Sequence, residues 1–326
     1  MKAIEFSQYG TPDVLRVVDL PRPTPKHDQV LIRVHASSIN SWDWELLNGI
    51  PFINRLLFGL FRPKPTKRVL GADVAGTVEE VGSRVTRFRP GDRVFGDLWD
   101  NWGGFAEFAC IDETSIEPIP SNSTFLEAAA VPQAGVLALQ GLRKGEPLSS
   151  GQKALINGAG GGVGTFAIQL AKLRGAEVTG VDASHKLDAI RDAGADYAID
   201  YAETDFTRTG ERYDLIVDCQ NFRPMRDNKR ALKPTGTYAM IGGSTSRVYE
   251  LWLLSFLSRF TREKRKLYLV AEGPNKGLTE LCELMQSGKL VSVIDRIFSL
   301  AEVPTAMRYF GEGRHRGKIL IEVRSE

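Results

Sequence analysis

Apolar and polar positions follow two different patterns along the chain. In residues 1–122, short runs of β-type residues occur at 30–35, 69–80 and 93–95. Turns rich in proline and glycine separate such runs, for example at residues 21–25. Many short strands with frequent turns are typical of a small β-barrel-like domain.

After Pro120 the pattern changes to apolar strands that alternate with amphipathic helices. We expect strands at residues 153–157, 177–182, 197–200, 213–218, 237–241 and 267–271, and helices at residues 123–130, 162–174, 186–193 and 276–286. This alternation predicts βαβ units that form a parallel sheet with helices on both faces. The last apolar run, residues 318–323, is a strand that could return to the first domain.

The most informative segment is the corner between the strand at residues 153–157 and the helix that follows it. Five glycines lie between residues 158 and 164. Glycine allows a tight turn and a close approach of the backbone to a pyrophosphate, and the start of the helix offers free N–H groups to an anion. We therefore predict a dinucleotide-binding turn, in which alanine replaces the first glycine of the usual fingerprint. Its expected residues are Ala159, Gly161, Gly162, Val163 and Gly164.

An acidic residue, Asp182, ends the next predicted strand, 18 residues after Gly164. Its carboxylate would accept hydrogen bonds from the ribose 2′-hydroxyl of NAD and repel the 2′-phosphate of NADP. Lys186 follows closely and could neutralise that phosphate, or it could be a solvated helix residue. These residues leave the choice between NAD and NADP open. A second turn, Gly242–Gly243, also lies at a strand end, where open α/β sheets bind ligands.

The composition bounds the class of protein. A chain of 326 residues is long enough for roughly two domains, and 42% hydrophobic with 25% charged residues is ordinary for a globular protein. With 42 Lys and Arg against 40 Asp and Glu, the net charge of +2 gives no long-range attraction for nucleic acid or an anionic membrane. The three cysteines are sparse, which suits a reducing compartment, so we expect a cytoplasmic protein. No apolar stretch reaches the ~20 residues of a membrane-spanning helix.

Several motifs in a fixed order resemble the medium-chain dehydrogenase/reductase superfamily, specifically its zinc-free quinone oxidoreductase-like branch. They lie at residues 71–78, 91–96, 103–108, 158–172, 194–201, 236–243 and 316–320. The resemblance implies an α/β fold with a GroES-like β-barrel-type catalytic domain over residues 1–122 and a Rossmann domain, with a doubly wound parallel sheet, over residues 123–272. It implies that residues 273–326 return to the catalytic domain. A cofactor cleft between the domains and, usually, a homodimer are also implied.

The resemblance also implies contacts to the cofactor. In similar enzymes a lysine at the place of Lys186 and a tyrosine at the place of Tyr201 contact the 2′-phosphate, which favours NADP(H). Asp182 departs from that pattern, so NAD(H) stays open. Gln133 is expected to contribute a further contact to the nicotinamide.

Zinc-dependent relatives provide a test for a metal. They carry Gly-His-Glu where this chain has Gly71, Ala72 and Asp73, and a cysteine where this chain has Asn40. Zn²⁺ requires imidazole and thiolate ligands, which alanine and asparagine cannot replace. We therefore expect no metal site and no zinc.

A metal-free site favours the reduction of quinones or α,β-unsaturated carbonyls, because hydride transfer to them gives a comparatively stable anion. In similar enzymes an asparagine at the place of Asn40 lies beside the nicotinamide and the substrate carbonyl. Its amide could donate to the developing oxyanion, or Asn40 could be a turn or cap residue. Asp43 could relay a proton, or it could be a capping or ion-paired carboxylate. Trp42 and Trp44 could wall an aromatic substrate pocket or pack in the core.

Two other functions remain open at this point. One is an NAD(P)H-binding redox-sensing or scaffold protein without turnover, and the other is a metal-free alcohol or ketone dehydrogenase. Two apolar segments, residues 50–61 and 251–260, have no assigned role. They could form a lipophilic pocket or a membrane-surface foot, or a buried helix and a dimer contact.

Overall fold

The computed structural model describes residues 1–99, 101–258, 264–271 and 273–324. The chain forms two compact units, of which the first combines Met1–Gln133 with Pro274–Glu326 and the second is Ala134–Gly273. The first unit extends beyond residue 122, because helix α3 (Phe125–Ala129) packs against strands of its sheet.

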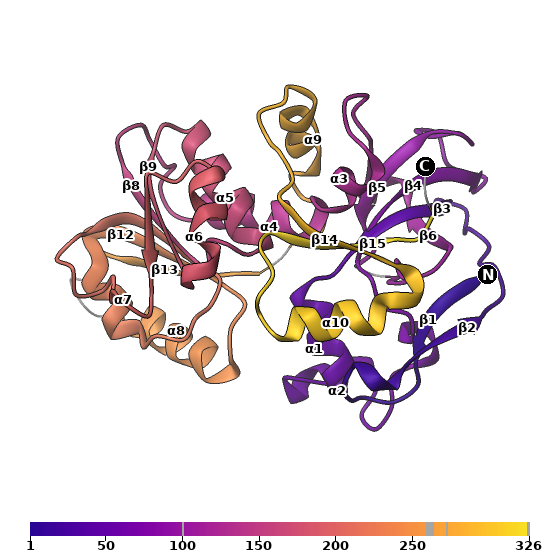
Figure 1. The fold of residues 1–326 in the computed structure, drawn as a ribbon, viewed down its shortest axis with the longest axis horizontal. Coiled ribbons are helices and arrows are strands. Elements are labelled where there is room, and N and C mark those ends of the chain that lie inside the picture. The colour runs from indigo at the N-terminus through magenta and orange to yellow at the C-terminus, as the bar shows by residue number, and fades with distance from the viewer. Residues whose placement is uncertain (100, 259–263, 272, 325–326) are drawn as a thin grey trace. The chain divides into compact units, whose positions relative to one another are not determined.

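The first unit is built on a mixed sheet (Figure 1). Its described strands follow the order β14-β15-β3-β4-β5-β7, and β6 pairs with β3. Their bounds are β3 Gln29–Ser38, β4 Asp73–Val81, β5 Arg93–Asp97, β6 Phe108–Asp112, β7 Ile116–Pro118, β14 Ile294–Ser299 and β15 Lys318–Glu322. A separate hairpin pairs β1 (Lys2–Phe6) with β2 (Leu15–Asp19). The C-terminal strand β15 runs antiparallel to β3 and thus belongs to the sheet of the first unit.

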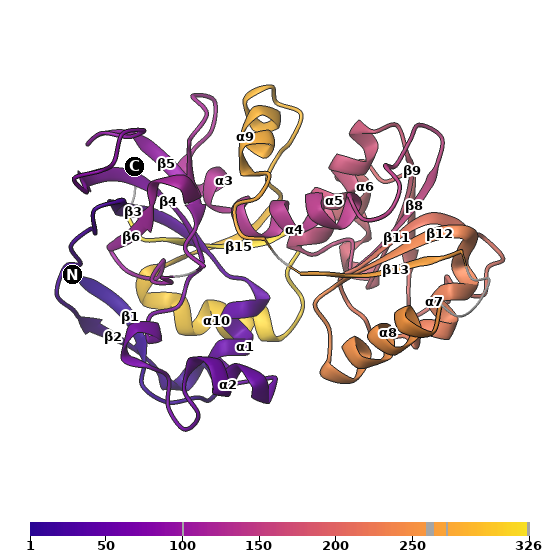
Figure 2. The same cartoon turned by 180° about the vertical axis from the view of Figure 1, so that it is seen from behind.

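The first unit also contains short helices. They are α1 Ser41–Asn48, α2 Phe52–Phe58, α3, α9 Leu278–Gln286 and α10 Val303–Gly311, with 3-10 turns at Pro12–Val14, Pro65–Lys67, Glu113–Ser115 and Leu300–Glu302. Helix α10 packs against α1, as the view from behind in Figure 2 also shows. Buried apolar side chains from α1, α10, β1 and β15 form one core, which fixes the position of the first turn of α1.

The second unit is a parallel sheet in the order β10-β9-β8-β11-β12-β13. The strands are β8 Lys153–Asn157, β9 Glu177–Asp182, β10 Tyr197–Asp200, β11 Tyr213–Asp218, β12 Leu232–Ile241 and β13 Lys266–Val270. The helices are α4 Pro132–Leu142, α5 Gly162–Leu173, α6 Leu187–Asp192, α7 Met225–Ala231 and α8 Thr245–Ser258, with a 3-10 turn at Ser184–Lys186. Helices α5 and α6 cover one face of the sheet, and α7 and α8 cover the other (Figure 1).

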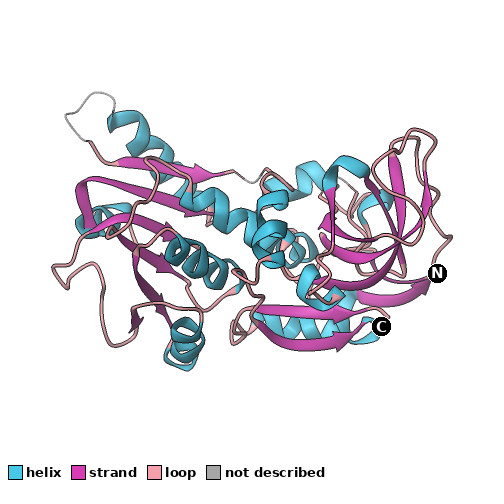
Figure 3. Ribbon diagram, turned by 90° about the horizontal axis from the view of Figure 1, so that it is seen from above, coloured by secondary structure: helices cyan, strands magenta, loops and turns pink. Residues whose placement is uncertain are grey.

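The strand order reverses between β8 and β11, which makes this the doubly wound Rossmann arrangement. Figure 3 shows the strands in magenta and the helices packed on them in cyan. The predicted strands at residues 153–157, 177–182, 197–200 and 213–218 are confirmed without shift. Strand β12 begins at Leu232 rather than at residue 237, because Leu232 pairs with Tyr213 across an irregularity in the ladder.

None of the helices that the structure describes combines the length and the hydropathy that a bilayer-spanning segment requires.

Candidate active site

The predicted phosphate turn joins β8 to α5, and its glycines have different roles. Gly158 has a φ of +83°, which favours glycine. A Cβ at Gly164 would lie only 2.3 Å from the carbonyl oxygen of Gly158, so the fold itself requires glycine there. A Cβ at Gly161 would meet only that same oxygen, at an ordinary 3.5 Å. The fold therefore has space for a Cβ at Gly161, and glycine there leaves that space open.

The start of α5 carries no side-chain cap. Its N-cap residue is Gly161, which has no side chain to accept from the N–H groups of the first turn. Gly162, Val163 and Gly164 are the first residues of this 12-residue helix, and Ala159 is fully buried in the turn before it. Uncapped N–H groups at the positive end of a helix favour an anion such as a phosphate.

Asp182 at the end of β9 contacts the turn directly. Its Oδ2 accepts a hydrogen bond from the Gly160 N–H at 3.0 Å, and its Oδ1 accepts from the Ala183 N–H at 2.9 Å. The Lys186 Nζ lies 3.8 Å from Oδ1, and both side chains are almost fully buried. The carboxylate that the sequence assigned to the ribose therefore also braces the phosphate turn.

Tyr201 lies at the same edge of the sheet. Strand β10 runs parallel to β9, and the Tyr201 N–H donates to the Asp182 carbonyl oxygen at 3.2 Å. The Tyr201 side chain is exposed, whereas Lys186 is buried. The structure thus brings together the residues that the sequence assigned to the ribose and its 2′-position.

A buried polar cluster that the sequence analysis missed holds the neighbouring strand ends. The Asp218 carboxylate, fully buried at the end of β11, accepts from Asn157 Nδ2 at 2.7 Å and from the Tyr238 hydroxyl at 2.7 Å. Burial and the nearby charge of Asp218 raise the pKa of Tyr238, so its hydroxyl stays a donor. Because Asn157 directly precedes the glycine turn, this cluster fixes where the turn begins. Polar residues that end apolar strands were the available signal.

The same cluster positions the second turn. The Asn221 N–H donates to Asp218, and Asn221 Nδ2 donates to the Ile241 carbonyl oxygen at 2.9 Å. Gly242 and Gly243 follow, both with positive φ. The second glycine turn is therefore tied to the end of β11 through one side chain.

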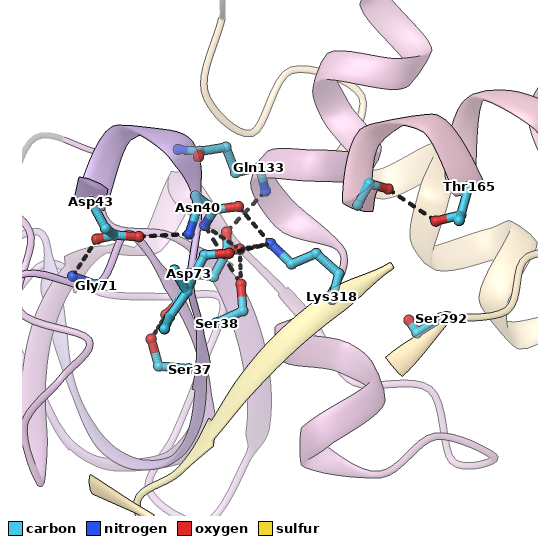
Figure 4. A network of polar contacts seen from close by, with 12 residues as sticks. Ser37, Ser38, Asn40, Asp43, Gly71, Asp73, Gln133, Thr165, Ser292 and Lys318 are labelled. Carbon is cyan, nitrogen blue, oxygen red and sulfur yellow. Dashed lines mark hydrogen bonds and ion pairs between the residues drawn. The ribbon is translucent and has the colours of Figure 1, made fainter. Parts of the chain in front are cut away.

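In the first unit, Asp73 is the centre of a buried network (Figure 4). Its Oδ2 accepts from Ser38 Oγ at 2.5 Å and from Asn40 Nδ2 at 2.9 Å. Its Oδ1 accepts from the backbone N–H of Gln133 at 2.9 Å. The Lys318 Nζ lies 3.4 Å from Oδ2 and completes the set. Three separate strands and the start of α4 thus meet at one carboxylate.

Lys318 fixes the orientation of the Asn40 amide. Its Nζ donates to Asn40 Oδ1 at 2.5 Å, while Asn40 Nδ2 faces Asp73 and, at 3.5 Å, Ser38 Oγ. Burial lowers the pKa of Lys318, and the charge of Asp73 opposes that effect. The oxyanion-donor role expected for Asn40 stays a prediction, since it requires one of these bonds to be exchanged for a bond to substrate.

Asp43 has the geometry of a cap. Its Oδ2 accepts from the Asn40 N–H at 2.9 Å, which closes a capping box at the start of α1, and its Oδ1 accepts from the Gly71 N–H at 2.8 Å. The residue is fully buried, and this burial raises the pKa of Asp43 to about 7. Both oxygens are occupied by backbone donors, so the arrangement matches the capping carboxylate rather than the proton relay.

Gln133 has a polar group without a partner. The side chain is 1% exposed, and its Nε2 is buried with no hydrogen-bond acceptor among the described residues. It extends away from Lys318, while the backbone N–H of the same residue is held by Asp73 (Figure 4). An unsatisfied buried donor costs about 1–3 kcal/mol. The Gln133 amide is therefore the clearest candidate for a group that binds a ligand.

The two tryptophans of α1 have different surroundings. Trp42 is partly exposed and makes an edge-to-face contact with Trp99, with ring centroids 4.8 Å apart. Trp44 faces Phe310, and its ring fills the space beside Gly311 in α10. Trp44 thus packs in the core, and Trp42 keeps an aromatic edge near the start of α1.

The residues at the positions where zinc-dependent relatives carry their ligands do not fit that ion. Within the described part of the chain, no group of three or more His, Cys, Asp or Glu side chains is placed to hold a metal. Ala72 offers no donor, and the ammonium of Lys318 already contacts Asn40 and lies near Asp73. A second cation beside this ammonium would be repelled.

Comparison with known proteins identifies the family. Residues 26–121 match the alcohol dehydrogenase GroES-like domain, and residues 193–321 match a family described as zinc-binding dehydrogenase. The chloroplastic quinone-oxidoreductase QR1 of Triphysaria versicolor is 32% identical over 336 residues, which cover 99% of this chain and 98% of that protein. The chloroplastic NADPH-dependent alkenal/one oxidoreductase of Arabidopsis thaliana is 30% identical over 334 residues, which cover 98% of this chain and 79% of that protein.

A solved structure agrees with these relatives. The quinone oxidoreductase from Coxiella burnetii matches with a TM-score of 0.88 and 32% identity, and 99% of each chain is covered. The likeness therefore includes both units and the C-terminal return strand. The chain belongs to the quinone oxidoreductase-like branch of the medium-chain dehydrogenase/reductase superfamily.

Proposed function

We propose that this protein is a zinc-independent, NAD(P)H-dependent oxidoreductase that reduces quinones or α,β-unsaturated carbonyls by hydride transfer. The observation that carries the proposal is the uncapped glycine corner before α5, where Gly161 leaves room that the fold does not need. The names of the Triphysaria and Arabidopsis relatives, a quinone oxidoreductase and an alkenal/one oxidoreductase, support the substrate class.

The chain's own groups fit a dinucleotide. The N–H groups of Gly162, Val163 and Gly164 would hold the pyrophosphate, with Ala159 and Gly161 beneath it. Asp182, Lys186 and Tyr201 would surround the adenosine ribose, and Gly242 and Gly243 would line the edge of the sheet. The reduced nicotinamide supplies the hydride when it is bound.

We favour NADP(H) over NAD(H). Lys186 and Tyr201 lie at the same strand ends as Asp182, and the Lys186 ammonium offsets the negative charge of that carboxylate. A 2′-phosphate would then meet less repulsion than Asp182 alone would impose. The Arabidopsis relative is named as NADPH-dependent, which supports the same choice.

In this proposal the Gln133 amide, rather than that of Asn40, donates to the anion that develops on the substrate or to the nicotinamide carboxamide. Its Nε2 has no acceptor within the described structure, whereas both ends of the Asn40 amide are bonded. Asn40, Asp73 and Lys318 would act as positioning residues. They hold the start of α4, and with it the backbone of Gln133.

The chemistry proposed does not require a metal. An alcohol dehydrogenase must remove a hydroxyl proton before hydride leaves, and a bound metal or a base assists that step. Reduction of a quinone or an enone forms a phenolate or an enolate, which water can protonate. A neutral donor placed near the carbonyl oxygen, such as the Gln133 amide, is sufficient to stabilise that charge.

Purified protein should be mixed with NADPH and, separately, NADH in the presence of a panel of quinones, enones and simple ketones. We expect turnover of quinones or enones, a higher kcat/KM with NADPH, and no stoichiometric zinc by elemental analysis. Cofactor binding without any turnover would favour a scaffold or sensor instead, and oxidation of simple alcohols would favour a dehydrogenase.

The Gln133 assignment has its own test. Gln133→Leu should lower kcat by at least about tenfold. Loss of a single oxyanion donor in other enzymes lowers kcat by about 100- to 1000-fold. The matched control is Gln8→Leu, because Gln8 is exposed in the first unit and bonds to none of these residues. Equal kcat values for the two variants would remove Gln133 from the reaction.

Oligomeric state and cellular location stay predictions. A homodimer follows from the family resemblance alone. A cytoplasmic location rests on cysteine usage, and Cys110, Cys219 and Cys282 all carry free thiols in the structure.

A further inference from the structure

Residues 50–68, here called the α2 segment, expose large apolar side chains on the first unit. Phe61 is 85% exposed and Phe52 is 61% exposed. Ile50, Leu56 and Leu60 are exposed as well. Isolated exposed apolar residues are ordinary, but five within a dozen positions of one segment form a patch that calls for a contact.

The segment is held in this outward position by polar bonds. The Tyr9 hydroxyl donates to the Gly59 carbonyl oxygen at 2.6 Å, and the Asn54 side chain donates to the Ile50 carbonyl oxygen at 2.9 Å. Arg55 Nε donates to the Gly49 carbonyl oxygen at 3.1 Å and stacks on the Tyr9 ring. The backbone is thus fastened to the unit while the apolar side chains point to solvent.

All charged residues of the α2 segment are basic. It contains five basic residues and no acidic residue, namely Arg55, Arg62, Lys64, Lys67 and Arg68. Because the whole chain has a net charge of +2, the remaining residues carry a net charge of −3. The overall balance therefore conceals a local concentration of positive charge, of which Arg68 is offset in part by Glu5, 3.8 Å away. Arg62 and Lys64, both exposed, lie next to Phe61 in the sequence.

We propose that the α2 segment is a docking surface for an anionic lipid bilayer. Exposed aromatic and aliphatic side chains enter the boundary between headgroups and acyl chains, and neighbouring Lys and Arg bind the lipid phosphates. A second copy of the chain is the weaker alternative, because a two-fold contact would place each basic segment against its own copy. An anionic lipid supplies the negative charge that a contact between two copies of the basic segment would lack.

The same combination occurs once more in the chain. Helix α8 exposes Tyr249, Trp252, Leu253, Phe256 and Leu257, whose spacing places them on one face. Residues 259–266 then contain five basic residues and one acidic residue. Of the apolar run predicted at residues 251–260, positions 259 and 260 lie outside the described residues. Helix α8 therefore exposes a second apolar face, and a basic stretch follows it in the sequence.

The test is flotation of the full chain with vesicles of phosphatidylcholine alone and of phosphatidylcholine mixed with phosphatidylserine. We expect binding to the mixed vesicles, weakened by added salt, and little binding to phosphatidylcholine alone. The double variant Phe52→Ser with Phe61→Ser should lower the apparent partition constant about tenfold or more. Arg62→Glu with Lys64→Glu should abolish the preference for phosphatidylserine.

Matched controls separate the segment from general surface effects. Phe222→Ser removes another exposed aromatic ring, and Lys289→Glu reverses the charge of another exposed lysine. Both controls should bind mixed vesicles like the unchanged protein. Thermal unfolding of every variant should remain cooperative, which shows that lost binding is not lost folding.

Three results would overturn the proposal. The first is no flotation of the unchanged protein with mixed vesicles. The second is flotation that the Phe52 and Phe61 variants leave unaltered. The third is self-association, seen by analytical ultracentrifugation without lipid, that the same variants abolish, since the segment would then contact a second copy. None of these measurements uses substrate, so the outcome is independent of the proposed reaction.

Discussion

Replacing Lys318 by methionine is the sharpest perturbation of the first unit. Methionine keeps much of the length of the side chain but removes the ammonium that lies 2.5 Å from Asn40 Oδ1 and 3.4 Å from Asp73 Oδ2. The Asp73 carboxylate, fully buried, would then keep its neutral donors but lose its cation. Removing one partner of a buried ion pair costs about 3–5 kcal/mol. Because burial already lowers the pKa of Lys318, we expect the lower end of that range.

The companion variant is Asp73→Asn, which removes the negative charge instead. Each single change leaves the other member of the pair without its partner, and the double change removes both charges of the pair. We therefore expect the double variant to be more stable than the sum of the two single losses implies, with a coupling energy of at least about 1 kcal/mol. Urea unfolding of the four proteins, followed by circular dichroism, measures these differences, and equal m-values would confirm that the unfolded states are comparable.

Steady-state kinetics of the same variants provide a second, independent measurement. Loss of Lys318 frees the Asn40 amide to rotate, and the start of α4 loses part of its support. We expect kcat to fall more than KM for NADPH rises, because the dinucleotide turn lies in the second unit. Additive stability losses, within about 0.5 kcal/mol, would refute the coupling between Lys318 and Asp73. An unchanged kcat in Lys318→Met would refute its positioning role.

Three further predictions concern the glycine corner, the ribose carboxylate and the cap of α1. Gly161→Val should fold normally but should no longer bind NADPH in a fluorescence titration. Gly164→Val should fail to fold stably, because only its Cβ collides with the backbone. Equal behaviour of the two variants would contradict the different roles assigned to these glycines. Asp182→Asn should keep an acceptor for the Gly160 N–H while raising the ratio of NADP(H) to NAD(H) affinity, and an unchanged ratio would mean that the carboxylate does not face the ribose. The pKa of Asp43 is raised to about 7, so the folded protein binds this proton more tightly than the unfolded chain and the free energy of unfolding should fall as pH rises from about 4 to about 7. Asp43→Asn should remove up to about 4 kcal/mol of that fall in urea titrations across this range, and a curve parallel to that of the unchanged protein would disprove the raised pKa.

The second unit was readable from the sequence because its strands are buried on both faces. Such strands are continuous apolar runs with polar residues at their ends, and four of them were located without shift. The first unit was less readable. Its strands are irregular, and two register shifts interrupt the pairing of β3 with β4. Helix α10 and strand β14 were missed, since their position depends on packing against α1 and on pairing with β15.

The partners of Asn40 could not be found by spacing. Lys318 lies 278 residues away, and Asp73 lies 33 residues away. Asp73 reaches Asn40 because β4 pairs with β3, and Lys318 reaches it because β15 pairs with β3. A lysine at the start of the apolar strand β15 was the one local sign. By contrast, the capping role of Asp43 was within reach, because it lies three residues after Asn40, as a capping box requires.

In the described structure, some polar groups at the candidate site have hydrogen-bond partners and others have none. Asp182 and Asn40 have the residue types expected at a ligand site, yet the fold already uses their hydrogen-bonding atoms. The Nε2 of Gln133, the uncapped start of α5 and the space at Gly161 have no such use within the described residues. A buried donor without an acceptor destabilises the empty protein, and a ligand that supplies the acceptor recovers that free energy on binding. The groups that the fold leaves unpaired are therefore the ones on which cofactor and substrate should depend most.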